Sequence, residues 1–453
     1  MKYIISCRFV ITMVFLFTVT DARLQPRVIS ITDLGIVSHP PTVINRDGGF
    51  TTLVGGKVLW TFGDTFFNIR AADGSSYRSN TAALADPAAP LLLSEAVDSN
   101  GTPLPALPFT AEEQAFNDST GSATDRIALW IGGLVAENDS TALVFYAKWH
   151  VRGALDYRFL GVGTARFTSG STTGTRDTRL LFSENEPVFV KAFLHEGMVY
   201  LYGSVPGDGL AQRQYLARAP MDSARLRAAY RIWNGNDWDI DVENRAPVFS
   251  GASSGVSVAY NRFLQNFTVV YSPPFSNRVL MRTAPRPEGP WSDPLELFIG
   301  MEPNAGRYNR QGLQHPELAQ NDGQTIFVSY FRPTGGFSGE LRMVEVTFDM
   351  PVSVSRPGAR PTEFSLEQSY PNPFNSSTVI HYQLPVNSLV ELAIFNVKGQ
   401  RVRTLVQTVK SAGRHRSVWN GRNDAGNPAP SGVYLYRIKA GKFYTTRRLI
   451  LMR

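Results

Sequence analysis

The residues best suited to chemistry in this 453-residue chain are two aspartates near its start. Asp47 precedes two glycines, and Asp64 follows Gly63 in the segment Leu59–Phe66. Glycines permit tight turns and close backbone approach, so both carboxyl groups can be directed to one point. Hydrolysis of a glycosidic bond needs two such groups, one protonated and one ionised. The alternative is that Gly63-Asp64-Thr65 forms a β-turn whose aspartate only caps the backbone.

Glu186 is a third carboxyl group that suits the same chemistry. It lies beside Asn185 and before Pro187, and burial in a channel would raise its pKa toward that of a general acid. We expect Asp64 to act as base or nucleophile, with Asp47 and Glu186 as alternative proton donors. The competing interpretation of Glu186 is a surface carboxylate at the end of a strand.

Other side chains suit the binding of a sugar. Trp149 can stack on a sugar ring, and His150 beside it can bind a hydroxyl group. His315 and Glu317, in the segment Gln314–Leu318, are further candidates, although a hydrogen-bonded structural role would also explain both histidines. The sequence has no HExxH helix, no Gly-x-Ser-x-Gly elbow and no phosphate loop, so it predicts no metal site and no cofactor.

A repeated pair of strands must position these residues. The repeated unit is an apolar strand, a short turn and a second strand that ends in an aromatic residue. Its five first strands are Phe50–Leu53, Ile131–Val135, Val188–Ala192, Gly255–Tyr260 and Glu317–Ala319. Most copies are followed by a further strand. The repeats predict an all-β fold, a five-bladed β-propeller over residues 23–350, in which candidate acids meet at one mouth of a central channel.

One long insertion interrupts the repeats between Asp86 and Arg126. Within it, Thr110 and Glu113 have the spacing of a capping box, which predicts one short helix. We expect the insertion to form a loop over one face of the propeller, either as a lid over a pocket or as an inert decoration.

The charge of the chain is unevenly distributed. The formal net charge is +7, but residues 363–453 alone hold 13 Lys and Arg against 4 Asp and Glu, a net of +9, and the first 22 residues add +1. The intervening body is therefore near −3. Because the basic charge does not lie on the body, the sequence predicts no nucleic-acid partner.

The N-terminal segment Met1–Ala22 has the layout of a signal peptide. Lys2 and Arg8 precede an apolar run, Phe9–Val19, and small residues precede Arg23. The run is too short to span a bilayer comfortably, so we expect a cleaved leader and no transmembrane segment, with a membrane anchor as the alternative. The single cysteine of the chain lies in this leader, so the mature protein would have no disulfide bond.

The C-terminal residues form a separate pattern of short strands. Val379–Leu384 and Val390–Phe395 alternate with a period of two, and Asn-Pro, Lys-Gly and Ser-Gly pairs mark turns around them. Residues 351–362, rich in Arg and Pro, read as a linker. The pattern predicts a small immunoglobulin-like β-sandwich over residues 363–453.

Four motifs in this module resemble a known export signal: Ser369–Asn375, Val397–Gln400, Trp419–Asn423 and Ser431–Tyr436. Their order and spacing resemble the type A sorting domain of the type IX secretion system of Bacteroidetes and related phyla. The resemblance implies contact with that secretion machinery and a protein that is secreted or held at the outer cell surface. A carbohydrate-binding or merely structural sandwich is the alternative.

The body resembles a second family through Asp47–Gly49, Leu59–Phe66, Ser79–Leu84 and Gln314–Leu318. These segments are similar to a family of bacterial five-bladed propellers, some members of which are endo-D-arabinanases. Asp47 and Asp64 match the positions of the family's acids, and Asn80 is a candidate substrate ligand. The resemblance implies a glycoside hydrolase acting on a furanoside or related polysaccharide. The alternative is a non-catalytic propeller that binds surface polysaccharide or a protein partner.

Overall fold

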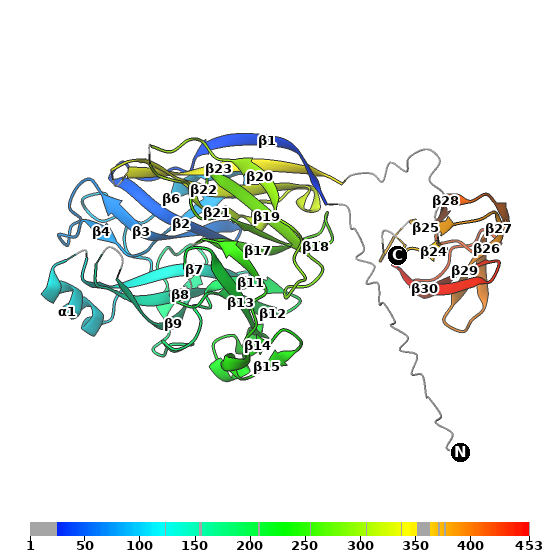
Figure 1. The fold of residues 1–453 in the computed structure, drawn as a ribbon, viewed down its shortest axis with the longest axis horizontal. Helices are drawn as coiled ribbons and strands as arrows, with labels where there is room; N and C mark the ends of the chain where they lie inside the picture. The colour runs from blue at the N-terminus through cyan, green and yellow to red at the C-terminus, as the bar shows by residue number, and fades with distance from the viewer. Residues whose placement is uncertain are drawn as a thin grey trace, which may run out of the picture. The chain divides into compact units, whose positions relative to one another are not determined.

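The computed structural model describes residues 25–122, 124–153, 156–206, 209–253, 255–304, 306–336, 338–350, 363–369, 372–375 and 377–452 (Figure 1). The chain divides into two compact units, Met1–Pro351 and Val352–Arg453, which are treated separately below. The predicted signal peptide and linker lie outside the described residues.

The described strands of the first unit form five antiparallel sheets. The first sheet contains β2 (Val43–Val54), β3 (Lys57–Phe67), β4 (Tyr77–Arg78), β5 (Thr81–Asp86) and β6 (Ala89–Ser94). The second contains β7 (Arg126–Asn138), β8 (Thr141–Val151), β9 (Tyr157–Thr168) and β10 (Thr175–Arg176). The third contains β11 (Lys191–His195), β12 (Met198–Gly203), β13 (Gln212–Pro220), β14 (Arg231–Trp233), β15 (Trp238–Asp239) and β16 (Phe249–Ala252).

The remaining two sheets complete the unit. The fourth contains β17 (Val256–Asn261), β18 (Asn266–Tyr271), β19 (Arg278–Ala284) and β20 (Leu295–Ile299). The fifth contains β21 (Arg310–Gln314), β22 (Thr325–Gly335), β23 (Ser338–Asp349) and β1 (Arg27–Ile36). Short 3-10 turns η1 (Met221–Ser223), η2 (Arg227–Ala229), η3 (Val242–Asn244), η4 (Pro316–Leu318) and η5 (Asn321–Gly323) connect strands. The predicted all-β class is confirmed.

The five sheets form a closed ring around their first strands. β2 contacts β7, β7 contacts β11, β11 contacts β17, β17 contacts β21, and β21 returns to β2. One apolar cluster lies between each pair of neighbouring sheets. Between the fifth and first sheets, for example, Phe331 and Met343 pack with Trp60 and Phe62 of β3. This arrangement is that of a β-propeller, in which each sheet packs against its neighbours on both sides.

Strand β1 closes the ring by joining the beginning of the unit to its end. It pairs with β23 from Arg27 opposite Asp349 to Ile36 opposite Arg342. Asp33 accepts hydrogen bonds from the Arg342 guanidinium at 3.1 and 3.0 Å. Figure 1 shows β1 beside β23. The pairing covers an edge that would otherwise leave backbone groups open to another chain.

Two of the inner strands start at residues other than those predicted from the sequence. In the third sheet the ladder with β12 begins at Lys191, because the N–H groups of Phe189 and Val190 bond carbonyls two residues earlier in the chain. Glu186 therefore precedes the strand instead of opening it. In the fifth sheet the inner strand is β21, whereas Glu317 lies in the 3-10 turn η4 that begins with Pro316. Proline has no N–H to donate to a ladder, so Pro316 favours the turn over a strand at this position.

The predicted short helix is α1, Ala111–Thr120, and its capping box is present. Glu113 accepts the N–H of Thr110 at 2.9 Å through its side chain, and its own N–H bonds Thr110 Oγ1 at 3.2 Å. Arg176 and Lys148 of the second sheet also pair with the Glu113 carboxylate, both at 2.6 Å. These contacts fix the helix to β8 and β10. No helix within the described ranges has the length and apolar character to span a bilayer.

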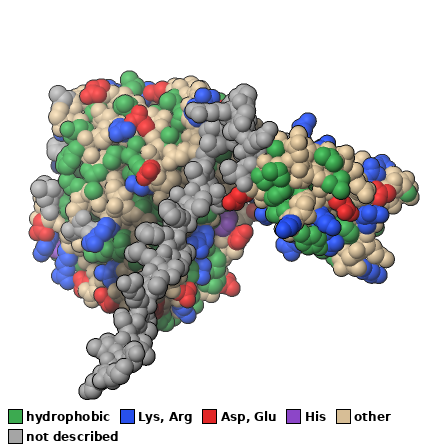
Figure 2. Space-filling view, turned by 45° about the vertical axis from the view of Figure 1, so that its right-hand side comes forward, with side chains coloured by type: hydrophobic (Ala, Val, Ile, Leu, Met, Phe, Trp, Pro, Cys, Tyr) green, Lys and Arg blue, Asp and Glu red, His purple; other side chains and the backbone are tan. Residues whose placement is uncertain are grey.

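The second unit is a two-layer β-sandwich. One sheet contains β24 (Ser365–Leu366), β25 (Thr378–Leu384) and β28 (Gly413–Trp419). The other contains β26 (Ser388–Asn396), β27 (Arg401–Lys410), β29 (Gly432–Ala440) and β30 (Phe443–Leu451). Trp419 packs against Phe374 and Tyr434 in a core that takes residues from both sheets. Figure 2 shows Lys and Arg side chains on the visible face of this unit.

Candidate active site

A cavity of about 540 Å³ lies where the inner strands of the propeller begin. Asp47 and Asp64 both line it, together with Trp130 and Trp149 of the second sheet and Lys191 of the third. The volume is typical of a small-molecule or sugar subsite. The structure thus brings together the two aspartates and one tryptophan that the sequence singled out.

Backbone irregularities in β2 direct Asp47 toward the cavity. The β2–β3 register shifts on both sides of Gly48, and Gly48 and Gly49 adopt φ angles of +91° and +102°, which favour glycine. The Gly48 N–H donates to Gln311 Oε1 of β21 at 2.9 Å, which fixes the bulge to the fifth sheet. The glycines therefore give Asp47 its position, as their place in the sequence predicted.

Asp64 lies within β3, so the interpretation of Gly63-Asp64-Thr65 as a turn is wrong. Arg126 donates from Nη2 to Asp64 Oδ2 at 2.7 Å, and Trp130 donates from Nε1 to Oδ1 at 3.0 Å. The Arg126 side chain is buried, and its guanidinium lies 4.7 Å from the centre of the Tyr77 ring. Burial raises the pKa of Asp64, while Arg126 and Trp130 act in the opposite direction by stabilising the carboxylate.

Asp47 is in a different electrostatic environment. Burial raises its pKa to about 6, Asp64 adds to the rise, and Arg310 and Arg126 oppose it. The nearest of these cations is Arg310, whose Nη2 lies 3.7 Å from Asp47 Oδ2. Asp47 therefore keeps a proton to higher pH than an exposed aspartate, while Asp64 has a direct guanidinium partner. Two carboxyl groups in unlike environments are a known basis for separate acid and base roles.

The two aspartates approach each other across Gly63. A Cβ atom added to Gly63 would lie only 2.6 Å from Asp47 Oδ1, so the Asp47 carboxyl group packs on the backbone that directly precedes Asp64. Glycine at this position is what allows the approach, because any larger side chain would occupy the space of the carboxyl oxygen.

Aromatic rings form one wall of the cavity. The Trp130 ring lies 5.8 Å from Trp149 and 5.7 Å from Tyr157, measured between centroids, and all three residues line the cavity. Phe159 supports Trp149 from behind at 5.1 Å. Such a wall can stack on the apolar face of a sugar ring.

The sequence analysis missed three cavity residues, Trp130, Lys191 and Arg310, and also Arg126, which bonds Asp64 from outside the described lining. Arg126 and Trp130 belong to β7, Lys191 begins β11, and Arg310 begins β21. Lys191 had one visible signal, since it is the only charged residue in the apolar run Val188–Ala192. The others could not be found by pattern, because their roles depend on contacts between different sheets.

The structure separates Glu186 from the aspartate pair, so the predicted convergence of three acids on one mouth is wrong. Its carboxylate accepts the Ser183 N–H at 2.8 Å and Arg227 Nε at 2.6 Å. The described cavity lining does not include it. The displacement follows from the later start of β11, which leaves Glu186 in the preceding turn.

Two predicted sugar ligands have structural contacts outside the cavity. His150 Nε2 lies 2.8 Å from Asp125 Oδ1, and its ring contacts Phe116 of α1 edge-on. Asn80 is buried; its Nδ2 donates to Leu129 O at 3.0 Å and its Oδ1 accepts the Leu107 N–H at 2.6 Å. Asn80 thus joins the first sheet to the second and to the insertion.

His315 is also a buried structural residue. Its Nδ1 lies 2.6 Å from Thr51 Oγ1, its Nε2 lies 2.9 Å from Ser329 Oγ, and its ring packs on Trp60. Burial lowers the pKa of His315 to about 3, so the ring is neutral at physiological pH. Both ring nitrogens are used within the protein, and neither is directed at a ligand.

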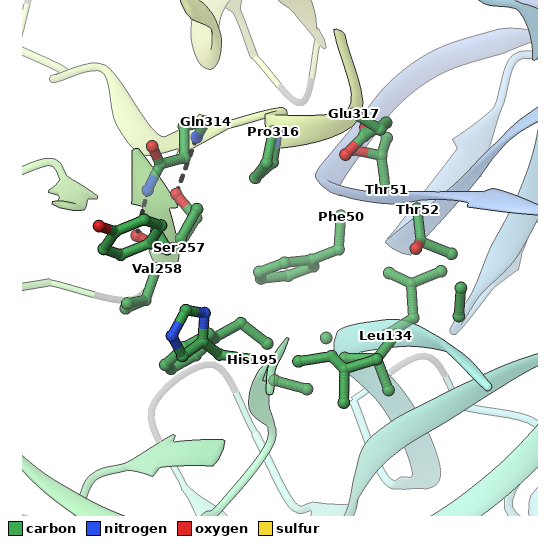
Figure 3. A pocket seen from close by; sticks show the side chains of 18 of the residues that line it. Phe50, Thr51, Thr52, Leu134, His195, Ser257, Val258, Gln314, Pro316 and Glu317 are labelled. Carbon is green, nitrogen blue, oxygen red and sulfur yellow. Dashed lines mark hydrogen bonds between the residues drawn. The ribbon is translucent and has the colours of Figure 1, made fainter. Parts of the chain in front are cut away.

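Glu317 lies in a second cavity, of about 720 Å³, at the opposite ends of the inner strands. Figure 3 shows it beside Thr51, across the cavity from Gln314 and Ser257, whose hydrogen bonds join β21 to β17. Phe50 lines both cavities and extends its ring into this one (Figure 3). The predicted grouping of Glu317 with the aspartates therefore does not occur.

Two segments of the chain match families of known proteins. Residues 164–336 match a domain of unknown function, DUF4185, and residues 375–442 match the FlgD Ig-like domain. The second match agrees with the predicted immunoglobulin-like sandwich. No curated protein matches the sequence.

Solved structures resemble the chain at low sequence identity. A candidate hydrolase from Bacteroides ovatus ATCC 8483 is 16% identical, with a TM-score of 0.50 over 68% of this chain and 87% of that one. Zg3597, a family 117 glycoside hydrolase from Zobellia galactanivorans, is 12% identical, with a TM-score of 0.45 over 74% and 94%. An exo-β-1,3-galactanase from Phanerochaete chrysosporium is 11% identical, with a TM-score of 0.42 over 90% and 95%. At these identities the likeness concerns the fold alone.

Proposed function

We propose that this protein is an exported glycoside hydrolase whose five sheets are the blades of a five-bladed propeller. The observation that carries the proposal is the pair of aspartates, Asp47 and Asp64, in one aromatic-lined cavity with unlike partners. Glycoside hydrolysis needs one carboxyl group that holds a proton and one that is ionised, and the raised pKa of Asp47 and the guanidinium partner of Asp64 suit these two roles.

The geometry supports a division of roles between the two groups. Asp47 donates its proton to the glycosidic oxygen as the bond to the anomeric carbon breaks. In one route Asp64 attacks that carbon, and water then hydrolyses the glycosyl–Asp64 ester while the deprotonated Asp47 takes a proton from the water. In the other route Asp64 takes a proton from the water that attacks the carbon directly. In both routes water supplies a hydroxyl group to one product and a hydrogen to the other. Arg126 and Trp130 each bond one oxygen of Asp64, and every carboxylate oxygen has a second lone pair for the reaction.

The substrate in this proposal is a furanoside or related polysaccharide. The resemblance of Asp47–Gly49 and Leu59–Phe66 to a propeller family that includes endo-D-arabinanases supports this choice. Trp149 and Tyr157 supply faces on which a sugar ring can stack. Glu186 has no assigned catalytic role, because it lies outside the described lining of the cavity.

A non-catalytic glycan-binding propeller is the second candidate. The observation that favours it is that both carboxylate oxygens of Asp64 already accept hydrogen bonds from the protein. In that case the aromatic wall would bind a polysaccharide, and the aspartates would bond its hydroxyl groups without cleavage.

We also propose that residues 363–453 are a sorting domain for type IX secretion, and that residues 1–22 are a signal peptide that is cleaved earlier in export. The sequence motifs support this role, and the compact sandwich with its own core is consistent with a separate module. The protein would then be released or attached at the outer cell surface.

A substrate screen tests the proposed activity. Residues 23–350 would be purified and incubated with arabinan, xylan, fructan and arabinogalactan, beside an Asp47→Asn/Asp64→Asn double variant. Release of reducing ends by the wild type alone would support hydrolysis. If calorimetry showed that both proteins bind a glycan and neither releases reducing ends, the hydrolase proposal would be wrong. The non-catalytic glycan-binding propeller would then be the better account.

A further inference from the structure

Lys191 is a charged residue of the active-site cavity to which the proposed mechanism gives no role. It is the first residue of β11 and lines the cavity with Asp47 and Asp64. Within the described part of the chain, its amino group has neither a hydrogen bond nor an ion pair. Burial lowers the pKa of Lys191 to about 8, and no neighbouring carboxylate compensates for it.

An amino group held in this way destabilises the empty protein. Removing an ammonium ion from water costs free energy unless an anion or several acceptors replace the water. Lysines that serve stability alone usually extend their amino group into solvent. The position of Lys191 at the cavity wall is therefore easier to explain if a bound ligand supplies the missing negative charge.

Arg310 adds a second positive charge to the same cavity. Its guanidinium lies 4.2 Å from the centre of the Phe331 ring, and its side chain is 39% exposed. Its one described carboxylate neighbour is Asp47, at 3.7 Å, which is longer than a direct hydrogen bond. Arg310 can therefore donate to a ligand without breaking a strong internal contact.

The proposed mechanism increases the excess of positive charge in the cavity. The described lining contains no carboxylate besides those of Asp47 and Asp64. Asp64 is matched by Arg126, and Asp47 must be protonated when it acts as the acid. In that state neither Lys191 nor Arg310 has a charged partner in the cavity.

On the basis of the proposed function, we infer that Lys191 and Arg310 recognise an anionic group on the substrate. The substrate is then an acidic polysaccharide, whose sugar unit in the cavity carries a carboxylate or a sulfate ester. Arg310 offers a planar pair of donors that suits either group, and Lys191 offers a compact charge. A neutral polysaccharide would cover the half-buried Lys191 without supplying a counter-charge.

Matched pairs of glycans test the inference. Turnover and affinity would be measured for a uronic-acid oligosaccharide and its carboxyl-reduced form, and for a sulfated oligosaccharide and its desulfated form. We expect the wild type to prefer one charged form over its neutral partner by about tenfold or more, the size expected for one charge-assisted contact. The charged form that is preferred identifies the anion.

Variants of Lys191 connect the preference to this residue. Lys191→Met should reduce kcat/KM for the charged form about tenfold more than for the neutral form, and Lys191→Arg should keep most of the preference. Lys191→Met should also raise the melting temperature, because it removes an uncompensated charge. This measurement also shows whether the variant is folded. Lys57→Met, at an exposed lysine of β3, is the matched control and should retain the preference.

Two outcomes would overturn the inference: equal use of charged and neutral forms by the wild type, or equal losses on both forms in Lys191→Met. Failure of the hydrolase proposal would look different. In that case no glycan would be cleaved, while calorimetry with Asp64→Asn and wild type would still report whether the charged forms bind more tightly.

Discussion

The protonation of Asp47 sets the pH range in which the proposed hydrolase works. Because burial raises the pKa of Asp47 to about 6, the acid form of the residue is lost as the pH rises through that value. We expect kcat/KM to fall about tenfold per pH unit above pH 6. Since Arg310 lowers the pKa of Asp47, Arg310→Gln should move this decline to higher pH. A pH profile that rises or stays level above pH 6 would exclude Asp47 as the acid.

Glu317 is a buried carboxyl group in the second cavity that affects stability. Its Oε1 has no hydrogen-bond partner among the described atoms, and burial raises its pKa from 4.5 to about 7. The folded state therefore binds more protons than the unfolded state between these values, so stability falls as the pH rises through this window.

Replacement of Glu317 by glutamine should remove this loss. We expect Glu317→Gln to raise the melting temperature at pH 8, by an amount equivalent to at most about 3 kcal/mol, and to have little effect at pH 4. Thermal unfolding of both proteins at the two pH values measures the difference. A variant that is less stable than wild type at pH 8 would show that the Glu317 carboxylate has a favourable partner.

At the scale of strands, the packing of β2 on β3 holds the two aspartates in place. Gly63→Ala would put a Cβ atom 2.6 Å from Asp47 Oδ1, so the carboxyl group must move away. We expect a loss of roughly 100-fold in turnover with little change in melting temperature, because misplacement of a reacting group by about 1 Å has an effect of this size.

A double variant shows whether the loss acts through Asp47. In an Asp47→Asn background, Gly63→Ala should cause little further loss of turnover, because the displaced group is already inactive. Additive losses would instead indicate that Gly63→Ala disturbs β3 or Asp64 independently of Asp47.

The strands that could be predicted are those specified by local pattern. The hairpins β2–β3, β7–β8 and β17–β18 follow apolar runs joined by short turns, and the capping box at Thr110 specified the start of α1. The pairing of β1 with β23 joins residues more than 300 positions apart, as Arg27 and Asp349 show. No local pattern specifies such a pairing, since it depends on closure of the whole ring.

The candidate site could be predicted only in part for the same reason. Asp47 and Asp64 lie beside glycines on paired strands of one sheet, so local sequence was sufficient to associate them. Glu186 was misplaced because β11 starts only at Lys191, after the N–H groups of Phe189 and Val190 make local hydrogen bonds. Lys191 and Arg310 line the cavity and Arg126 bonds Asp64, each from a different sheet, so only the assembled propeller brings them near the aspartates.

At the scale of the whole chain, the two compact units have separate cores, so each should fold without the other. We expect deletion of Phe364–Arg453 to leave a folded propeller that accumulates in the periplasm of the native host. Cell fractionation of the full-length and truncated proteins measures this, with the melting temperature of the purified propeller as the control for folding. Normal amounts of the truncated protein in the culture medium would rule out the sorting role.

The central claim is that Asp64 takes part in bond cleavage, and it is tested most directly by comparing turnover with affinity in Asp64→Asn. The variant is nearly isosteric and should keep the hydrogen bond from Arg126 through its amide oxygen while losing that from Trp130, so the fold should be kept and the glycan affinity should change far less than turnover. We expect kcat to fall by about 10³-fold or more on a substrate found in the screen, while Glu186→Gln, the matched control outside the cavity, keeps nearly full activity. Equal turnover by wild type and Asp64→Asn would contradict the proposed active site.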